Sequence, residues 1–493
     1  MEGIIRPALL LMTGRMIGYA VCFLIPLVLV RFLDQEVFGT YKQLFLIYGS
    51  LYIIAQLGIS ESLYYFLPEG NKRSGSYVCN ALIMLVLFGS APLIALWVFG
   101  DSIASAMNND LLSGKLPWIG LFTWLMLISS VLEITLTATK RHAIASSSYA
   151  IFDTARAFAC IIPVVLFKDL DWLLVMIVVV GFVRFFITIA YLRSHFKSEF
   201  RPRLNVLGRQ LAYAVPFGLA VFVEVLQAQF HFYFVSYKSD AASFAIYAVA
   251  CLNIPIVDYL ATSASNVLMV RMRELSSNLK ELVRVWNDAI RKLSLLVFPL
   301  VGLLLVSAEQ FIVVLFTEQY QEATPIFMVW MLGLAFAVAP VDGALRVFAE
   351  TRVLLIINII RLAFVLTLIP SFYSWFGIVG PVAVTVGASL VHKVLGLIRL
   401  RQVIGVPLRS LFPVKEIARL LLIASASMIP PIFMMDRLDA SPAVLLLIAC
   451  ALYVSVYLTL LMLIGRLEGD ERKEVIAWAR SPISIVEKIF KGS

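Results

Sequence analysis

Charged residues are scarce in this chain of 493 residues, and the residue patterns of soluble enzymes are missing. Asp, Glu, Lys and Arg together make up 14% of the sequence, whereas soluble domains carry about 25%. No Gly-rich phosphate-binding loop and no Ser/His/Asp set occurs. The low charge excludes a soluble globular protein, and the sequence gives no support to ATP-driven transport by this chain alone.

Cysteine and histidine are also few, with five and four residues. The cysteines lie in or at the edge of apolar segments, and no Cys-x-x-Cys motif is present; they are Cys22, Cys79, Cys160, Cys251 and Cys450. We therefore expect neither a disulfide framework nor a zinc site, and no other metal or cofactor.

Apolar segments fill the sequence instead. Hydrophobic residues make up 61% of it and the mean hydropathy is +0.93. About fourteen segments reach the roughly 20 residues that a membrane-spanning helix needs, among them the second at 42–67 and the eighth at 243–270. They are continuously apolar, as in Leu173–Val180, whereas barrel strands alternate. The sequence predicts an all-α integral membrane protein.

Basic residues set the predicted orientation. They gather between alternate apolar segments, most densely at 193–209 and 271–292, and are sparse in the intervening loops. Lys and Arg mark the cytoplasmic side of membrane proteins. We therefore expect both termini to be cytoplasmic, and we interpret the net charge of +9 as a topology signal and not as a nucleic-acid site.

A short motif recurs in the two halves of the chain. Asp34, Phe38 and Tyr41 have the same spacing as Asp240, Phe244 and Tyr247, and each triplet opens an apolar segment. The recurrence predicts two related halves, and paired repeats in transporters face each other across a central site.

Further motifs resemble the polysaccharide-transporter branch (Wzx-like O-antigen flippases) of the multidrug/oligosaccharidyl-lipid/polysaccharide exporter superfamily. The similar stretches are Arg31–Leu33 with Phe38–Tyr41, Leu57–Ser60, Glu309–Phe316, Tyr320–Pro325 and Phe376–Gly380. Their order along the chain carries the resemblance. The chain departs from many relatives at Tyr64-Tyr65, where an arginine is usual, and at Gln229–His231, where an aspartate is usual.

The resemblance implies two pseudo-repeated six-helix lobes around a central cavity, with two added helices. The implied divisions are a first lobe at 1–200, a second lobe at 201–402, helices 13 and 14 at 403–466, and a cytoplasmic amphipathic tail at 467–493.

The resemblance also implies a cargo and a location. The cargo is a polyprenyl-diphosphate-linked oligosaccharide, carried from the inner to the outer leaflet of the bacterial cytoplasmic membrane for O-antigen or exopolysaccharide synthesis. A polysaccharide polymerase and a chain-length regulator are the implied partners, and the protein is not expected to be an enzyme.

Charged residues inside apolar segments are the candidate site residues, because each is costly in a bilayer unless it faces a cavity or a partner. Arginine suits a diphosphate, since its planar fork stays charged. The candidates for diphosphate and sugar binding are Arg15, Arg156, Arg184 and Arg361, and those for coupling to a proton or sodium ion are Glu224, Asp258, Glu61 and Asp153. Arg15, Arg184 and Arg361 have no opposite charge within a helical turn, which favours a cavity-facing position for them.

Other polar residues have structural interpretations. Asp153 and Arg156 are spaced to neutralise each other on one helix face, which competes with their assignment to the site. Asp342 and Arg346 have similar spacing, and Lys393 lies near enough to the cytoplasmic surface to snorkel. The single histidines His231 and His392 favour a structural role.

Two further functions fit parts of the sequence. A drug or organic-cation antiporter of the same superfamily would have an acid-rich, cation-poor cavity, which the buried arginines argue against. An integral-membrane glycan polymerase or ligase would handle the same lipid-linked sugar, but its typical large outer loop has no counterpart in this sequence.

Overall fold

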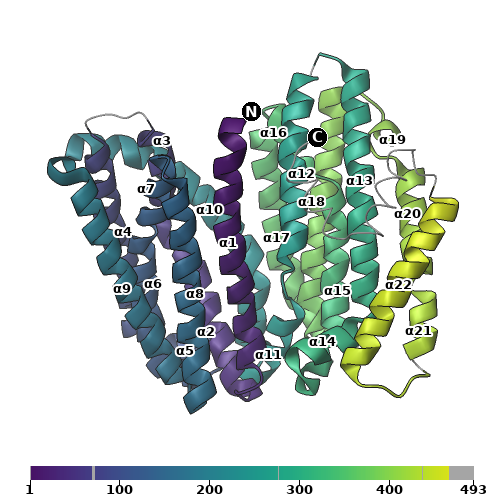
Figure 1. Ribbon diagram of the computed structural model, residues 1–493, viewed down its shortest axis with the longest axis horizontal. Coiled ribbons are helices and arrows are strands. Elements are labelled where there is room, and N and C mark those ends of the chain that lie inside the picture. Colours follow the sequence, from purple (N-terminus) through teal and green to yellow (C-terminus); the bar gives the residue numbers. More distant parts are fainter. Residues whose placement is uncertain (1, 69–72, 276, 436, 466–493) are drawn as a thin grey trace. The chain divides into compact units, whose positions relative to one another are not determined.

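The computed structural model describes residues 2–68, 73–275, 277–435 and 437–465, and all the regular structure in these ranges is helical. The chain forms two compact units, Met1–Ala248 and Val249–Ser493 (Figure 1). The boundary falls at residue 248, within a helix, whereas the predicted first lobe ends at residue 200. The first unit therefore contains more of the chain than the predicted first lobe. This division reflects packing, and the repeat-based lobes stay a prediction. The expected tail at 467–493 lies outside the described residues.

The first unit is built around its most enclosed span. Its helices are α1 (Glu2–Leu29), α2 (Gln35–Gln56), α3 (Ile59–Phe66), α4 (Ser74–Val98), α5 (Gly100–Ala106), η1 (Asp110–Lys115), α6 (Leu116–Ser129), α7 (Val131–Ala138), α8 (His142–Phe167), α9 (Leu170–Phe196), η2 (Lys197–Glu199), α10 (Leu204–Lys238) and α11 (Ala241–Ala250), the last crossing the unit boundary. The apolar window of Asp110–Ala138 is 89% buried, because α2, α4 and α9 all pack against α6. Figure 1 shows the long helices of this unit running side by side.

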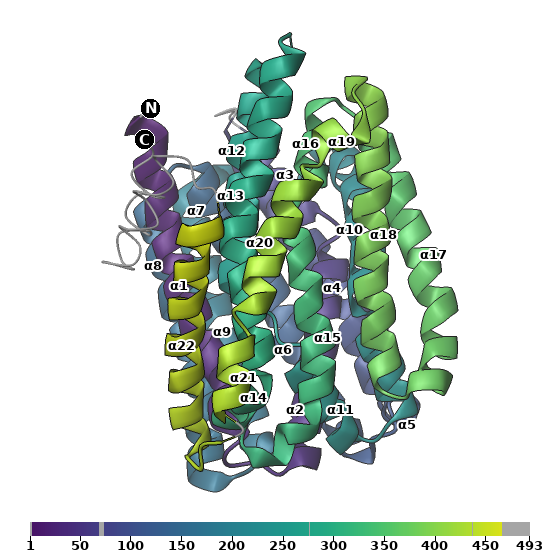
Figure 2. The same cartoon turned by 90° about the vertical axis from the view of Figure 1, so that its right-hand side faces the viewer.

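The second unit has its core around α13. Its helices are α12 (Pro255–Glu274), α13 (Leu279–Val306), α14 (Ala308–Phe316), η3 (Glu318–Ala323), α15 (Thr324–Leu334), η4 (Ala335–Val338), α16 (Val341–Val347), α17 (Thr351–Phe376), α18 (Val379–Ile404), α19 (Leu408–Leu411), α20 (Val414–Ala426), α21 (Ile429–Met435) and α22 (Pro442–Ile464). Both α20 and α22 pack on α13 (Figure 2). Tyr457 donates its hydroxyl to the Leu295 carbonyl at 3.3 Å, which ties α22 to α13. The long helices α17 and α18 form a close pair.

The predicted count of fourteen spans is not confirmed. Within the described residues, eleven helices are long and apolar enough to cross a membrane, and twelve if the bent pair α2 and α3 is one span. That pair bends by 45°, because Leu57 and Gly58 both take positive φ angles, 45° and 71°. The predicted eighth span is divided into α11 and α12, and Pro255 opens α12 at a position that needs no N–H.

The recurring motif has the same structure in both copies. The Asp34 carboxylate accepts a hydrogen bond from the Val37 N–H, and the Asp240 carboxylate accepts one from the Ser243 N–H, both at 2.8 Å. Each aspartate therefore caps the N-terminus of its helix. The Phe and Tyr of both copies are buried, so the same residue types play the same parts in both copies.

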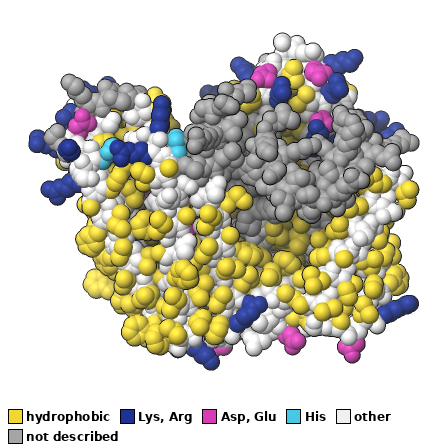
Figure 3. Space-filling view, in the orientation of Figure 1, with side chains coloured by type: hydrophobic (Ala, Val, Ile, Leu, Met, Phe, Trp, Pro, Cys, Tyr) yellow, Lys and Arg dark blue, Asp and Glu magenta, His cyan; other side chains and the backbone are white. Residues whose placement is uncertain are grey.

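The surface of the first unit shows the pattern of a membrane bundle. On the face that Figure 3 shows, apolar side chains form a broad band and Lys and Arg gather along its upper edge. Large apolar side chains such as Trp97 and Leu87 are more than half exposed on this unit. An apolar band with a basic edge is typical of helices that face lipid and end at a cytoplasmic surface.

Candidate functional site

Two glycines on α1 bring it against α8, and this contact positions the polar residues of the first unit. A side chain at Gly14 would collide with the backbone oxygen and the hydroxyl of Ser146, and one at Gly18 with the Asp153 carboxylate. The Gly-x-x-x-Gly spacing thus allows the close approach typical of membrane helices.

Arg15 lies at this contact and is exposed. Its Nη2 donates to the Tyr149 hydroxyl at 3.0 Å, and its guanidinium carbon lies 4.7 Å from the centre of the Tyr149 ring. Among the described residues it forms no ion pair with a carboxylate. A cation held by a neutral ring keeps its full charge, and this is the property that an anion-binding residue needs.

Arg156 lies two turns beyond Tyr149 on α8 and forms an ion pair. It contacts the Asp153 carboxylate at 3.1 Å, and its Nη2 donates to the Cys22 sulfur of α1 at 3.0 Å. The interpretation that Asp153 and Arg156 neutralise each other is therefore confirmed as a contact. The same pair also joins α8 to α1.

Arg184 of α9 is buried, with 8% of its surface exposed, and it has a carboxylate partner on another helix; its assignment to the substrate site stays a prediction. Its Nη2 lies 2.8 Å from the Glu133 carboxylate of α7. The same Glu133 oxygen accepts the Ser148 hydroxyl of α8, also at 2.8 Å, and the guanidinium lies over the Phe152 ring. Three helices are thus joined at one carboxylate.

Glu133 was missed in the sequence analysis, which examined opposite charges only within a turn of Arg184. The available signal was an acid within a predicted apolar span at 117–139, because such a residue needs a partner. Its partner lies on another helix, and sequence spacing gives no measure of that distance.

The short helix α3 brings Tyr64 near Arg15 and also carries Glu61 and Tyr65. Tyr64 interacts electrostatically with Arg15, Tyr149 and Glu61. Oε2 of Glu61 is buried, and it has no hydrogen-bond partner within the described ranges. The Tyr65 ring stacks on Tyr213 of α10, with ring centres 4.9 Å apart, and both rings are substantially exposed. Arg15 thus shares one surface of the first unit with exposed phenol rings.

Arg361 is the predicted site residue of the second unit that can be placed. It lies on α17 and donates from Nη2 to the Ser389 hydroxyl of α18 at 3.1 Å. Among the residues predicted to couple transport to an ion, Glu224 is exposed on α10. Asp258 lies on α12, but its side chain is outside the described part of the structure.

Asp342 of α16 has partners on α18 and not the predicted Arg346. Its Oδ1 lies 2.7 Å from His392 Nε2 and its Oδ2 lies 3.2 Å from Lys393 Nζ. The predicted Asp342–Arg346 pair is therefore wrong, since Arg346 points to the exposed face. Lys393 binds this carboxylate as well, instead of only snorkelling to the surface.

His231 has the structural role that the sequence predicted for it. Its Nδ1 lies 2.7 Å from the Tyr247 hydroxyl, and its side chain is buried. This contact joins α10 to α11 inside the first unit.

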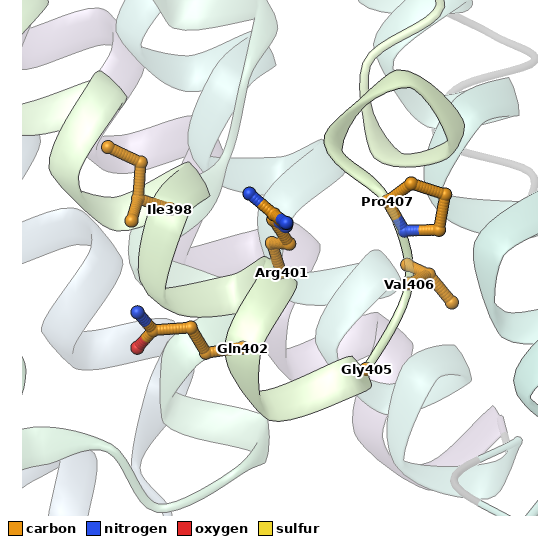
Figure 4. Close-up of a pocket in the computed structure, with 6 residues that line it drawn as sticks. All are labelled: Ile398, Arg401, Gln402, Gly405, Val406 and Pro407. Carbon is orange, nitrogen blue, oxygen red and sulfur yellow. The ribbon is translucent and has the colours of Figure 1, made fainter.

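A surface pocket of about 500 Å³ lies at the end of α18 (Figure 4). Its lining consists of Ile398, Arg401, Gln402, Gly405, Val406 and Pro407. None of the predicted site residues lines this pocket. The pocket lies where α18 ends and the chain turns at Gly405, whose φ is 75°. Among the described residues, no group of His, Cys, Asp or Glu is arranged to hold a metal ion.

The fold is that of known transporters. The structure of the lipid II flippase MurJ in an inward closed conformation matches 94% of this chain and 100% of its own, with a TM-score of 0.74 and 13% identity. An inward-facing multidrug resistance MATE family transporter of the MOP superfamily matches 80% of this chain and 98% of its own, with a TM-score of 0.64 and 14% identity.

A third structure, a MOP superfamily transporter from Pyrococcus furiosus, matches 81% of this chain and 96% of its own, with a TM-score of 0.54 and 14% identity. At such identities the likeness shows the fold. The comparison with curated protein sequences found no match.

A family described as polysaccharide biosynthesis protein matches residues 28–325, more than half of the sequence. This range includes Arg156, Arg184 and the buried Glu133. It confirms the resemblance that the motifs of the sequence indicated. The chain therefore belongs to the polysaccharide biosynthesis protein family.

Proposed function

We propose that this protein carries a polyprenyl-diphosphate-linked oligosaccharide from the inner to the outer leaflet of the bacterial cytoplasmic membrane. Membership of the polysaccharide biosynthesis family and a fold shared with a lipid II flippase support a lipid-linked sugar as the cargo. The glycan serves a surface or extracellular polysaccharide, and a polymerase and a chain-length regulator act on it after transport.

The observation that carries this proposal is the state of Arg15. It is exposed, it is held by the neutral Tyr149, and it forms no ion pair among the described residues. Arg156 and Arg184, in contrast, are each in contact with a carboxylate. We therefore assign the first contact with the diphosphate to Arg15. Arg361, which the sequence also predicts for diphosphate binding, lies on α17 and binds Ser389 of α18.

Reconstituted full-length protein provides the test. Liposomes carrying the protein and a fluorescent polyprenyl-diphosphate sugar should show label crossing the bilayer, measured by its access to an external quencher. Arg15→Ala should lower this rate at least about tenfold, because one charge-assisted contact is worth about 1.5–3 kcal/mol. Arg15→Lys should retain part of the rate, since it keeps the charge and loses the fork.

Arg193→Ala is the matched control, because Arg193 is exposed near the end of α9 and outside the site. Equal rates in wild-type and Arg15→Ala protein would contradict the role of Arg15. Failure of the wild type to move the sugar lipid, combined with export of organic cations, would favour the antiporter. Elongation of the glycan by the purified protein would favour an enzyme.

Uphill transport by this chain draws on an ion gradient, with a proton or a sodium ion as the coupling ion. The sequence prediction places the coupling carboxylates at Glu224, Asp258, Glu61 and Asp153, and this assignment stays a prediction.

A further inference from the structure

The second unit contains a cluster of three ionisable side chains that the sequence analysis assigned to structural roles. It consists of Asp342 on α16 and of His392 and Lys393 on α18. Each carboxylate oxygen of Asp342 contacts one of the two neighbours, at 2.7 Å to His392 and 3.2 Å to Lys393. We call these residues the Asp342 cluster. The His392 side chain is 8% exposed and that of Asp342 is 41% exposed.

The cluster lies far from either end of its main helix. α18 has 26 residues, which corresponds to a length of about 39 Å, and His392 lies about 20 Å from its first residue. An ionisable group at such a depth in a membrane helix marks an ion or substrate pathway by default. Histidine is also the side chain that changes charge between about pH 5 and 8.

We propose that His392 is the proton-binding residue that couples transport to a proton gradient, with Asp342 as its positioning residue. The proposal rests on the transport function proposed above, and it moves the coupling site from Glu224 and Asp258 to α16 and α18.

The two nitrogens of His392 are in different situations, and this difference supports the proposal. A carboxylate only accepts hydrogen bonds, so Nε2 carries the hydrogen that faces Asp342. Nδ1 is buried and has no hydrogen-bond partner among the residues that the structure describes. In the neutral ring Nδ1 is an unprotonated lone pair, which is the position where an incoming proton binds.

Binding of that proton has opposite effects at the two nitrogens. It strengthens the contact with Asp342, because the hydrogen bond becomes one between two charges. It also creates a buried N–H donor with no acceptor, which costs about 1–3 kcal/mol. The protonated ring therefore favours an arrangement of α16 and α18 in which Nδ1 reaches an acceptor or water. A proton is thereby linked to a movement of helices, as alternating access requires.

The described helices that pack against α18 place few other charged residues near His392. Neither α15 nor η4, which pack against α18, contains a titratable residue. α17 contributes Arg361, bound to Ser389 one turn from His392, and α16 contributes the exposed Arg346. Arg409 is exposed on α19, which follows the C-terminal end of α18. Lys393 contacts the other oxygen of Asp342, so that the carboxylate keeps a cationic partner when His392 turns away.

The test compares flipping of the fluorescent sugar lipid with and without a proton gradient, using full-length protein in liposomes. A gradient of about two pH units supplies a roughly hundredfold driving factor per proton. The ratio of the two rates should be well above one for the wild type and close to one for His392→Gln, whose amide keeps a donor toward Asp342. Asp342→Asn should also lower the ratio.

One variant serves as the control. His231→Gln removes the other deeply buried histidine, which binds Tyr247, and it should keep the wild-type ratio. A wild-type ratio in His392→Gln would overturn the proposal, as would a wild type that flips the lipid at the same rate with and without the gradient. In the second case the proposed function still holds.

A measurement that needs no cargo keeps the two proposals separable. Nitrogen-15 resonances of the imidazoles, assigned to His392 by their loss in His392→Gln, should show whether Nδ1 gains a proton when the pH is lowered. Hydrogen exchange of α16, corrected for the intrinsic effect of pH, should change together with that resonance in the wild type and should not change in His392→Gln. A His392 resonance that never shows a protonated Nδ1, or an α16 that exchanges equally in both proteins, would overturn the proton site whether or not flipping is observed.

Discussion

At the scale of the residue, arginines with the same expected role have different environments. Arg15 is exposed and held by a phenol ring, whereas Arg184 is buried and shares Glu133 with Ser148. The Arg184 charge is balanced before any ligand arrives, so its principal effect in this structure is on packing. Arg15 is exposed and has no carboxylate partner among the described side chains, and it is the arginine for which the diphosphate proposal is most directly tested.

The Glu133–Arg184 pair gives a prediction about stability. Glu133→Gln should lower the free energy of unfolding by about 3–5 kcal/mol, because it leaves Arg184 as a buried charge without a counter-ion. The double variant Glu133→Gln/Arg184→Met should cost less, since it removes both charges. Unfolding of the purified protein by titration with a denaturing detergent measures both values.

The control for that prediction is an exposed pair on α13. Glu281 and Arg284 lie 3.7 Å apart with well-exposed side chains, and Glu281→Gln should change the free energy of unfolding by less than about 1 kcal/mol. Equal losses for the exposed and the buried pair would show that burial does not set the cost.

At the scale of the element, the close contact of α1 with α8 depends on the two glycines of α1, Gly14 and Gly18, which have no side chain. Gly14 lies against the backbone of Ser146, and a backbone cannot rotate away as a side chain can. The same two helices position Arg15, Tyr149, Cys22 and Arg156. The glycine spacing of α1 therefore determines the geometry of the candidate site as well as the packing.

Gly14→Val should separate α1 from α8, lower the thermal stability of the protein and reduce the flipping rate together. The reason is that Arg15 would lose its place over Tyr149. Melting temperature and transport rate, measured on the same preparation, test this expectation.

Gly49→Ala is the matched control, since a side chain at Gly49 of α2 meets open space. It should leave stability unchanged or raise it by about 0.5–1 kcal/mol, the amount by which glycine weakens a helix interior. A Gly14→Val protein as stable and active as Gly49→Ala would mean that the α1–α8 contact is dispensable.

At the scale of the whole molecule, the distribution of Lys and Arg predicts which loops face the cytoplasm. The link at 193–209 is basic, whereas α10 ends with a single lysine, Lys238, just before the short connection to α11. The positive-inside rule places the first on the inner and the second on the outer side.

Reporter fusions check this assignment. An alkaline phosphatase fused after Lys238 should be active, because it folds only outside the cytoplasm, and one fused after Arg203 should be inactive. A green fluorescent protein at the same two positions should give the opposite pattern. Activity of the phosphatase at Arg203 would reverse the whole topology, since α10 separates the two positions.

The sequence by itself determined the class of the protein and its family. Composition and apolar length are sums over many residues, so the prediction of a helical membrane protein is insensitive to the error at any single position. The recurring Asp-Phe-Tyr motif was also readable, because capping depends on a few neighbouring residues. Local chemistry of this kind is encoded within one helical turn.

Tertiary structure decided the number of spans and the partners of the charged residues. Leu57 and Gly58 bend one apolar segment, and the break before Pro255 divides another, although both segments are apolar enough to be continuous. Arg184 binds Glu133 and Asp342 binds His392 across about 50 residues of sequence, as the separations of 51 and 50 positions show. Ion pairs between helices depend on which helix faces meet. The packing of the whole unit determines those faces, and residue spacing along one helix does not reveal it.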